Sequence, residues 1–242
     1  MTECWPASRT NHKVFSAVHS AVQLGFTVIV LNQRGSTGFG VAHRNAAGQR
    51  QYGGLGAGGP PAEVFDIGGA VRFLKSVDNR FEPNRIGLWG FGAYGACWAA
   101  LAMTDAEAGT QVACAACCGG SYDMCALLEL QAPQLFRASV ARAHCMSPAT
   151  TRLVEAARRC TPVARLENWV PQSRLLLVHG DMDGPNCPAP LRDAVLLATA
   201  LRALPPASRS RCDLTVLPVT GRAMDMRAAI RASLNFLSTE LA

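Results

Sequence analysis

A glycine-rich stretch near the middle of the chain has the residue types and spacing of a turn that supports chemistry. Gly90, Gly92 and Gly95 form the pattern G-x-G-x-x-G between an apolar, strand-like run and a helix-like run. Such a turn binds the pyrophosphate of a dinucleotide in many α/β proteins. A turn of similar kind presents the nucleophilic serine of hydrolases, and here it contains no serine. Two interpretations are therefore open: a dinucleotide site, or a hydrolase turn without its nucleophile.

The dinucleotide interpretation requires an acidic residue at the end of the next strand, where it binds a ribose hydroxyl. The next strand-like run, 112–118, is followed by Gly119, Gly120 and Ser121, and the first acidic residue after it is Asp123. The pattern would also be expected after the first strand of the domain, whereas here a strand-like and a helix-like run precede it. Dinucleotide binding through GFGAYG therefore stays an alternative.

Short apolar runs alternate with amphipathic runs, and this alternation predicts the elements that position the turns. Strands are expected at 27–32, 86–90, 112–118, 175–180 and 213–218. Helices are expected near 12–24, 62–76, 93–104, 189–204 and 224–240. Continuous apolar strands separated by helices indicate a parallel sheet that is covered on both faces. In such sheets the chemistry gathers at the carboxyl ends of the strands.

Four motifs, in order along the chain, resemble the catalytic domain of the prolyl oligopeptidase family of serine peptidases. They are LNQRGSTGFG at 31–40, EVFDIGGAVRFLKS at 63–76, FEPNRIGLWGFGAYGA at 81–96 and LLLVHGDMDG at 175–184. The second motif places Glu63, Asp66 and Ala70 at the family's spacing. The resemblance covers about residues 12–240. It implies an α/β-hydrolase-type domain, with a mostly parallel sheet and helices on both faces.

The resemblance also implies where the catalytic triad lies, and two of its three positions have the wrong chemistry. Matching without gaps puts Gly92 at the position of the nucleophilic serine and makes Ala93 the source of an oxyanion-hole N–H; one inserted residue puts Ala93 at the serine position instead. Asp183 matches the triad aspartate, and Arg222 stands where the histidine is expected. A guanidinium is always protonated and cannot accept the serine proton. Neither glycine nor alanine can form an acyl-enzyme.

The sequence therefore predicts a catalytically impaired peptidase relative, a pseudopeptidase, with a peptide or protein ligand. The alternative is an active serine-type peptidase or esterase that uses an unrecognised nucleophile. The candidates for that role are Ser36, Ser121 and Cys97. Their ordinary interpretations are a turn residue, a residue with no histidine near it in the chain, and a small buried residue. His179 is implied by the resemblance to be structural.

The amino-terminal part of the chain lacks an element that the resemblance implies. The family's domain has a strand before its first helix, and residues 1–10 contain no apolar run. In the family's sheet that strand lies between the strands expected at 27–32 and 86–90, so its absence would leave backbone groups unpaired. We therefore expect an extension at 1–11 and a domain at 12–242 that lacks the N-terminal strands. Such a chain is either a fragment of a longer protein, or a partner chain completes its sheet.

The composition of the chain predicts which kinds of partner it binds and in which cellular compartment it lies. Of 242 residues, 49% are hydrophobic and 17% are charged, which is enough apolar material for one large core. The net charge of +6 is spread without a basic block, so we expect no nucleic-acid partner. The ten cysteines supply no second C-x-x-C to pair with Cys114 and Cys117, so no metal and no cofactor are expected. No apolar run reaches the ~18 residues of a membrane span, and the first residues do not resemble a signal peptide, which predicts a cytoplasmic protein.

Overall fold

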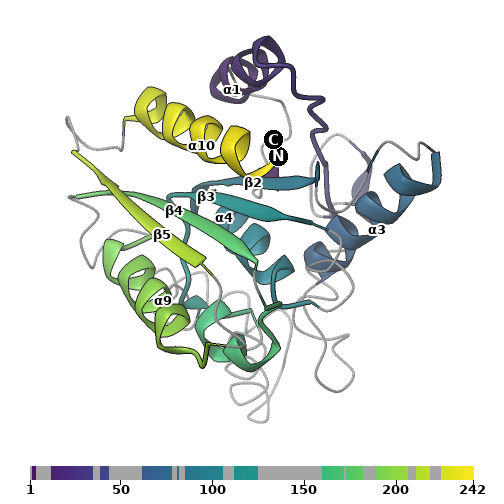
Figure 1. The fold of residues 1–242 in the computed structure, drawn as a ribbon. Helices are drawn as coiled ribbons and strands as arrows, with labels where there is room; N and C mark the ends of the chain where they lie inside the picture. Colours follow the sequence, from purple (N-terminus) through teal and green to yellow (C-terminus); the bar gives the residue numbers. More distant parts are fainter. Residues whose placement is uncertain are drawn as a thin grey trace.

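The chain folds into a parallel β-sheet between layers of helices (Figure 1). The computed structural model describes residues 2–3, 12–34, 39–43, 62–77, 81, 85–105, 112–124, 160–171, 173–181, 189–206, 211–218 and 225–242. Five strands follow one another in space in chain order, and every neighbouring pair is parallel. They are β1 (Thr2–Glu3), β2 (Gly87–Phe91), β3 (Cys114–Cys118), β4 (Arg174–Gly180) and β5 (Arg211–Leu217).

Helices cover both faces of this sheet. Crossover connections between parallel strands are right-handed, so successive helices lie on one face as long as the strand order runs in one direction. That face carries α4 (Gly92–Ala102), the 3₁₀-helix η2 (Pro162–Asn168) and α9 (Leu191–Ala203). The opposite face carries α1 (His12–Gln23) and α10 (Met226–Glu240), while α3 (Ala62–Val77) packs beside α4.

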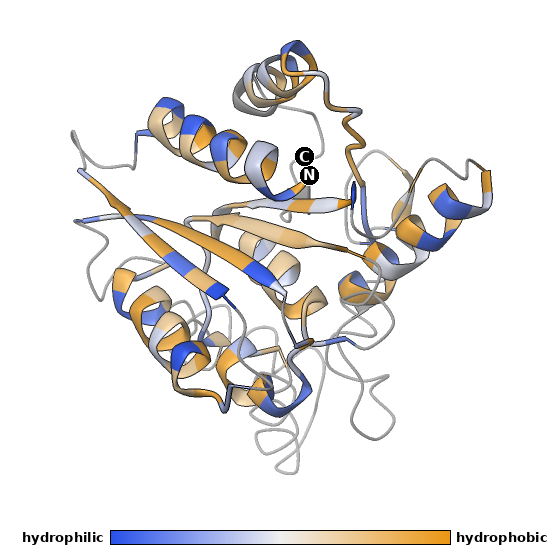
Figure 2. Ribbon diagram, viewed as in Figure 1, coloured by the Kyte–Doolittle hydropathy of each residue, from blue (hydrophilic) through white to orange (hydrophobic). Residues whose placement is uncertain are grey.

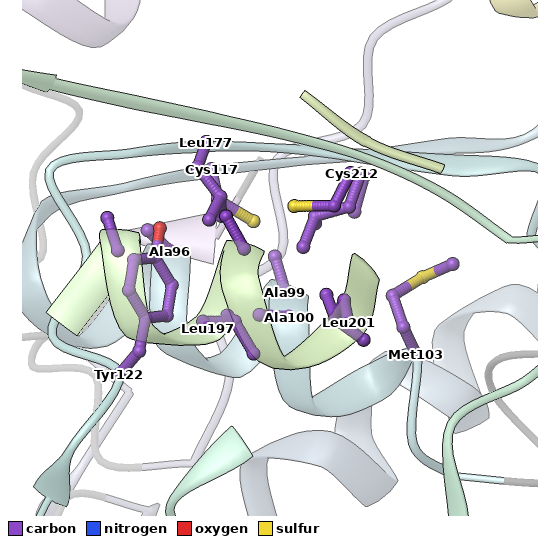
Figure 3. Packing of buried hydrophobic residues seen from close by; sticks show 14 of the residues in the cluster. Ala96, Ala99, Ala100, Met103, Cys117, Tyr122, Leu177, Leu197, Leu201 and Cys212 are labelled. Atoms are coloured by element: carbon purple, nitrogen blue, oxygen red, sulfur yellow. The ribbon is translucent and has the colours of Figure 1, made fainter. Parts of the chain in front are cut away.

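The core is centred on β3, whose five residues are all buried. Its sequence CAACC offers only small side chains, so α4 can approach it closely from one face and α10 from the other. Every residue of α4 from Gly95 to Ala102 is buried, as expected for a helix that is apolar on all sides. Figure 3 shows Cys117, Leu177 and Cys212 from three neighbouring strands packed with side chains of α4 and α9.

Most predicted elements are confirmed, with one correction. All five helices and the strands expected at 86–90, 112–118, 175–180 and 213–218 are present within a few residues. The strand expected at 27–32 is wrong: the structure gives no strand over 26–33. Conversely Thr2–Glu3, where no strand was expected, pairs with the last two residues of β2. The physical reason is that an apolar run forms a strand only as part of a ladder with a neighbouring strand, and none of the described strands pairs with 27–32.

Apolar side chains are exposed around this irregular segment. Ile29 is 39% exposed and Val30 36%, and on α3 Phe73 is 64% exposed. Figure 2 shows hydrophobic residues along the segment that follows α1, and hydrophobic residues interspersed with hydrophilic ones along α3. None of the helices that the structure describes is long and apolar enough to cross a membrane.

Candidate functional site

The turn from β2 into α4 has the backbone of a nucleophile-bearing turn. Gly92 is the first residue of α4, is exposed, and has a φ of +73°. Residues other than glycine rarely adopt such a φ, and the nucleophile of α/β-hydrolases lies on a sharp, strained strand-to-helix turn of this kind. A Cβ added at Gly92 would meet none of the described atoms within 4 Å. The turn therefore has room for a side chain at a position that carries none.

Gly92 differs from Gly90 and Ala93 in the space and the backbone conformation at each position, and its match to the serine position stays a prediction. A Cβ added at Gly90 would lie 2.4 Å from the carbonyl oxygen of Gly95, so the strand and the helix cross too closely for a side chain there. Ala93 is the second residue of α4 and is half-buried, and its carbonyl oxygen accepts the Ser121 N–H at 3.0 Å. The positive φ falls at Gly92.

The amino-terminal end of α4 lies at the same exposed turn. Phe91 occupies the N-cap position and makes no side-chain capping hydrogen bond. The first N–H groups of a helix have no partner within the helix, and the helix dipole makes this end positive. An oxyanion hole needs such N–H groups, aimed at the oxygen of the reacting carbonyl. The oxyanion role of Ala93 stays a prediction.

The other two predicted triad positions, Asp183 and Arg222, lie outside the described residues, as does Ser36. The structure therefore gives no distance between them and Gly92. The strand that leads to Asp183 is described, and it ends at the carboxyl edge of the sheet, where the Asp181 N–H donates to the carbonyl oxygen of Leu217 at 2.9 Å. Gly92 follows the carboxyl end of β2 on that same edge.

His179, in the motif before Asp183, is part of the core. Its exposed fraction is 0%, and its Nε2–H donates to the carbonyl oxygen of Gly120 at 3.1 Å. Its ring also packs against Tyr122, with 5.9 Å between the ring centroids. The histidine thus fixes the turn that follows β3 to the adjacent strand β4. This is the structural role that the resemblance implied.

Ser121 forms a buried polar cluster with a residue that sequence reasoning missed. Its hydroxyl points to the Asp193 carboxylate at 3.5 Å, and the Asp123 N–H donates to the same oxygen at 3.3 Å. Burial, together with the nearby Asp123 carboxylate, raises the pKa of Asp193. Because Ser121 is 0% exposed, substrate could not reach its hydroxyl. No motif marks Asp193, which is an ordinary acidic residue in the first turn of α9.

The buried cysteines are inaccessible to a substrate, and their thiols have pKa values too high for a nucleophile. Cys97 is 0% exposed, and its thiol donates to the carbonyl oxygen of Cys160 at 3.5 Å. Burial raises the pKa of Cys118 to about 11 and that of Cys114 and Cys212 to about 12. A reactive cysteine needs a lowered pKa, because the thiolate attacks. Within the described part of the chain, no three His, Cys, Asp or Glu side chains lie together as metal ligands would.

An ion pair joins two of the sequence motifs. Arg34, from the motif at 31–40, contacts Asp66 of α3, with Nη2 to Oδ1 at 2.7 Å and Nε to Oδ1 at 2.8 Å. The Arg34 N–H also donates to Asp66 Oδ2 at 2.9 Å. Such a forked contact fixes orientation as well as distance. It fastens the end of the irregular segment to α3, beside the carboxyl edge of the sheet.

The sequence model of the prolyl oligopeptidase family matches residues 12–218, so the chain belongs to this family. No curated protein sequence matches the chain. Both the order of the four motifs and the strand-to-helix turn at Gly92 are consistent with this membership. The dinucleotide alternative has no support in these findings.

Solved structures agree on the fold. A puromycin-hydrolyzing peptidase of Mycobacterium tuberculosis has a TM-score of 0.60 and 20% identity, covering 88% of this chain and 29% of its own. An acylaminoacyl peptidase of Pyrococcus horikoshii has a TM-score of 0.60 and 17% identity, covering 87% of this chain and 31% of its own. A further structure, a puromycin hydrolase, has a TM-score of 0.63 at 18% identity, covering 87% of this chain and 29% of its own. The chain thus has the peptidase α/β-hydrolase fold and spans about three tenths of the length of these proteins.

Proposed function

We propose that this chain is a pseudopeptidase, a member of the prolyl oligopeptidase family that binds a peptide or protein ligand without cleaving it. The observation that carries the proposal is Gly92, which has the backbone of the nucleophile turn and no side chain. An acyl-enzyme needs a hydroxyl or thiol at this point. Loss of triad members lowers turnover by about 10⁴- to 10⁶-fold.

The sequence at the histidine position supports the same conclusion. Arg222 matches that position, and a guanidinium stays protonated at every pH at which the protein is folded. It can neither take a proton from a nucleophile nor return one to a leaving group. Even a substitute nucleophile at the turn would therefore lack its general base.

An active enzyme would have to use another nucleophile, and the described candidates are unsuitable. Ser121 and Cys97 are both 0% exposed, and each is engaged with a neighbour in the core. A substrate amide or ester cannot reach either atom without opening the packing between the sheet and α4. We therefore do not favour the active-hydrolase alternative.

Ligand binding is supported by what the turn still offers. Gly92 is exposed, and Phe91, the N-cap residue of α4 beside it, makes no side-chain capping hydrogen bond. The N–H groups of such a helix end bind the carbonyl oxygen of a peptide or a carboxylate without any catalytic residue. We expect a bound peptide to lie across this turn, with a carbonyl oxygen directed at Ala93.

Hydrolysis tests the proposal, with a serine restored in either of two registers. The wild type, the Gly92→Ser/Arg222→His variant and the Ala93→Ser/Arg222→His variant are assayed with an activated ester and a Pro-containing dipeptide amide. We expect no turnover by the wild type above the uncatalysed rate. Measurable ester turnover by the Gly92→Ser pair alone would support the register with Gly92 at the serine position.

The same dipeptide amide tests binding in a second arm. Titration into the wild type should shift the backbone amide signals of Gly92 and Ala93 in NMR spectra, in a saturable manner. Wild-type turnover that a serine-directed phosphonate blocks would contradict the pseudopeptidase proposal. Saturable binding that leaves both amide signals unmoved would contradict the site.

A further inference from the structure

The turn at 119–123, which follows β3, packs directly on the start of α4. The Ser121 N–H donates to the carbonyl oxygen of Ala93 at 3.0 Å. Ala93 is the residue whose own N–H we expect to bind a carbonyl oxygen of the ligand. A Cβ added at Gly120 would lie 2.7 Å from the Cβ of Ala96, so the turn and the helix approach each other too closely for a further side chain. Any displacement of this turn therefore displaces the first residues of α4 with it.

Hydrogen bonds fasten the first half of this turn to β4. The Gly119 N–H donates to the carbonyl oxygen of Val178 at 2.8 Å. The ring Nε2 of His179 lies 3.1 Å from the carbonyl oxygen of Gly120. Both partners belong to β4, and both are 0% exposed. The first half of the turn thus has a rigid support, and its second half, 121–123, is held by a different element.

Asp193, in the first turn of α9, holds the second half of the turn. Its Oδ2 accepts the Asp123 N–H at 3.3 Å and lies 3.5 Å from the hydroxyl oxygen of Ser121. One carboxylate oxygen thus bridges the two ends of 121–123, and it holds the residue whose N–H binds Ala93. Loss of this carboxylate would leave the part-buried Asp123 N–H without this acceptor. Because a donor without its acceptor is costly in such a place, the turn would shift towards another partner.

The helix that carries Asp193 is fixed in the core. Ala194, Leu197 and Leu201 of α9 are each 0% exposed and belong to the same apolar cluster as Ala96 of α4. Figure 3 shows the two leucines packed with side chains of α4. A side chain on such a helix keeps its position more precisely than one on a loop. Asp193 is therefore a fixed point that can orient the turn after β3 and, through it, the start of α4.

We propose that Asp193 is a positioning residue for the ligand-binding turn at Gly92. By holding Ser121 it fixes the carbonyl group of Ala93, and with it the N–H groups at the start of α4. Groups that bind a ligand must be held to within ~0.5 Å of their productive geometry, and the residues behind them supply this precision. Asp193 acts through Ser121 and not by contact with the ligand. The inference rests on the proposed function, because it names a residue that sets the geometry of that same site.

Titration of the Pro-containing dipeptide amide into variants, followed by NMR, tests this role. Asp193→Ala should weaken binding about fivefold, the equivalent of one lost hydrogen bond, and should shift the Gly92 and Ala93 amide signals of the ligand-free protein. Asp193→Asn keeps an acceptor oxygen and should restore both. The matched control is Thr104→Val, which removes the buried acceptor of the Arg165 Nε–H beyond the opposite end of α4. It should leave the binding and both signals unchanged.

Circular dichroism establishes that each variant is folded at the temperature of the titration. Ser121→Ala removes one of the two groups that Asp193 holds and should show the same effects in smaller measure, so it replaces Asp193→Ala if that variant does not fold. Equal weakening by Asp193→Ala and Thr104→Val would overturn the proposal, because Asp193 would then contribute only to stability. Binding that Asp193→Ala leaves unchanged would overturn it as well.

The signals of the ligand-free protein separate this proposal from the proposed function. If the wild type does not bind the dipeptide amide, the proposed function fails, and these signals test the positioning role alone. A shift of the Ala93 signal in Asp193→Ala that is absent from Asp193→Asn and Thr104→Val would support that role. An Ala93 signal that does not move in Asp193→Ala would overturn it.

Discussion

The two sides of the sheet differ in how completely each strand is surrounded. On one side β4 and β5 are joined over seven residue pairs, and helix α9 covers them. On the other side β1 pairs with two residues of β2, and a cavity of about 930 Å³ separates the rest of β2 from the segment 26–31. On the first side β4 is buried from Leu175 to Gly180, whereas on the second side β2 has a pairing partner among the described strands at only two residues, and apolar side chains nearby are exposed.

The difference does not come from the hydrophobicity of the sequences. LLLVHG at 175–180 and TVIVLN at 27–32 are both apolar and strand-like. Leu177 and Val178 are nevertheless 0% exposed, while Ile29 and Val30 are 39% and 36% exposed. An apolar run therefore becomes a buried strand here where hydrogen-bonding neighbours are present on both edges.

The largest expected effect contrasts one aliphatic residue from each side. Leu177→Ala leaves a hole in the closed core and should lower the free energy of unfolding by about 3–5 kcal/mol. Ile29→Ala removes a residue that is already in contact with solvent, and should lower it by less than about 0.5 kcal/mol. Urea denaturation measures both. Equal losses would mean that the segment 26–31 is as well packed as β4.

The glycines of the β2–α4 turn give the next largest effect. Gly90→Ala puts a Cβ 2.4 Å from the Gly95 carbonyl oxygen, and should cost about 2–3 kcal/mol of stability. Gly92→Ala meets open space and costs only its positive φ, about 1 kcal/mol. Thermal unfolding of the two variants separates a packing cost from a backbone cost. If Gly92→Ala were the more damaging change, the side chain of residue 92 would not have the room that we describe.

Substitutions of Asp193 test the buried polar cluster that this residue forms with Ser121 and the Asp123 N–H. Asp193→Ala removes the acceptor of the Asp123 N–H, and should lower the free energy of unfolding by about 1–2 kcal/mol. Asp193→Asn keeps an acceptor oxygen and should be at least as stable as the wild type at pH 7, because burial raises the pKa of the wild-type carboxyl and disfavours its charge.

The pH dependence of the stabilities of the wild type and Asp193→Asn tests whether the pKa of Asp193 is raised in the folded state. The folded wild type holds the Asp193 proton more tightly than the unfolded chain does, so the wild type gains stability as the pH falls through the raised pKa towards 3.8. The advantage of Asp193→Asn should therefore shrink on acidification. An advantage that grows as the pH falls would contradict a raised pKa.

The smallest effect compares one ion pair from each side. Asp66→Asn weakens the forked contact between Arg34, whose side chain is 26% exposed, and residue 66, whose wild-type side chain is 21% exposed. It should lower the free energy of unfolding by about 1 kcal/mol. Asp213→Asn breaks the ion pair with Arg211. Because the Arg211 side chain is 63% exposed and that of Asp213 is 44% exposed, the change should affect stability little. Denaturation at low and high salt measures both. A larger loss for Asp213→Asn would reverse the comparison.

The sequence correctly predicts the five helices, four of the strands and the strand-to-helix turn at Gly92, because these features depend on local patterns. It could not establish that 26–33 forms no strand, because that outcome depends on whether a distant segment supplies a neighbour. It also missed Asp193, since a buried acceptor on α9 is paired by turns that are far away in the chain. Asp183 and Arg222, which lie outside the described residues, stay predictions from the family motifs.

Native-state hydrogen exchange tests the central claim most directly, because it measures pairing at single residues. Alternate residues of a strand direct their N–H groups to opposite edges, so at least one amide of Gly87–Trp89 points away from β3. We predict that this amide exchanges through local opening, far faster than the amides of Leu175–Val178, which should exchange only on global unfolding. Equal protection on both sides would contradict the difference in pairing between them.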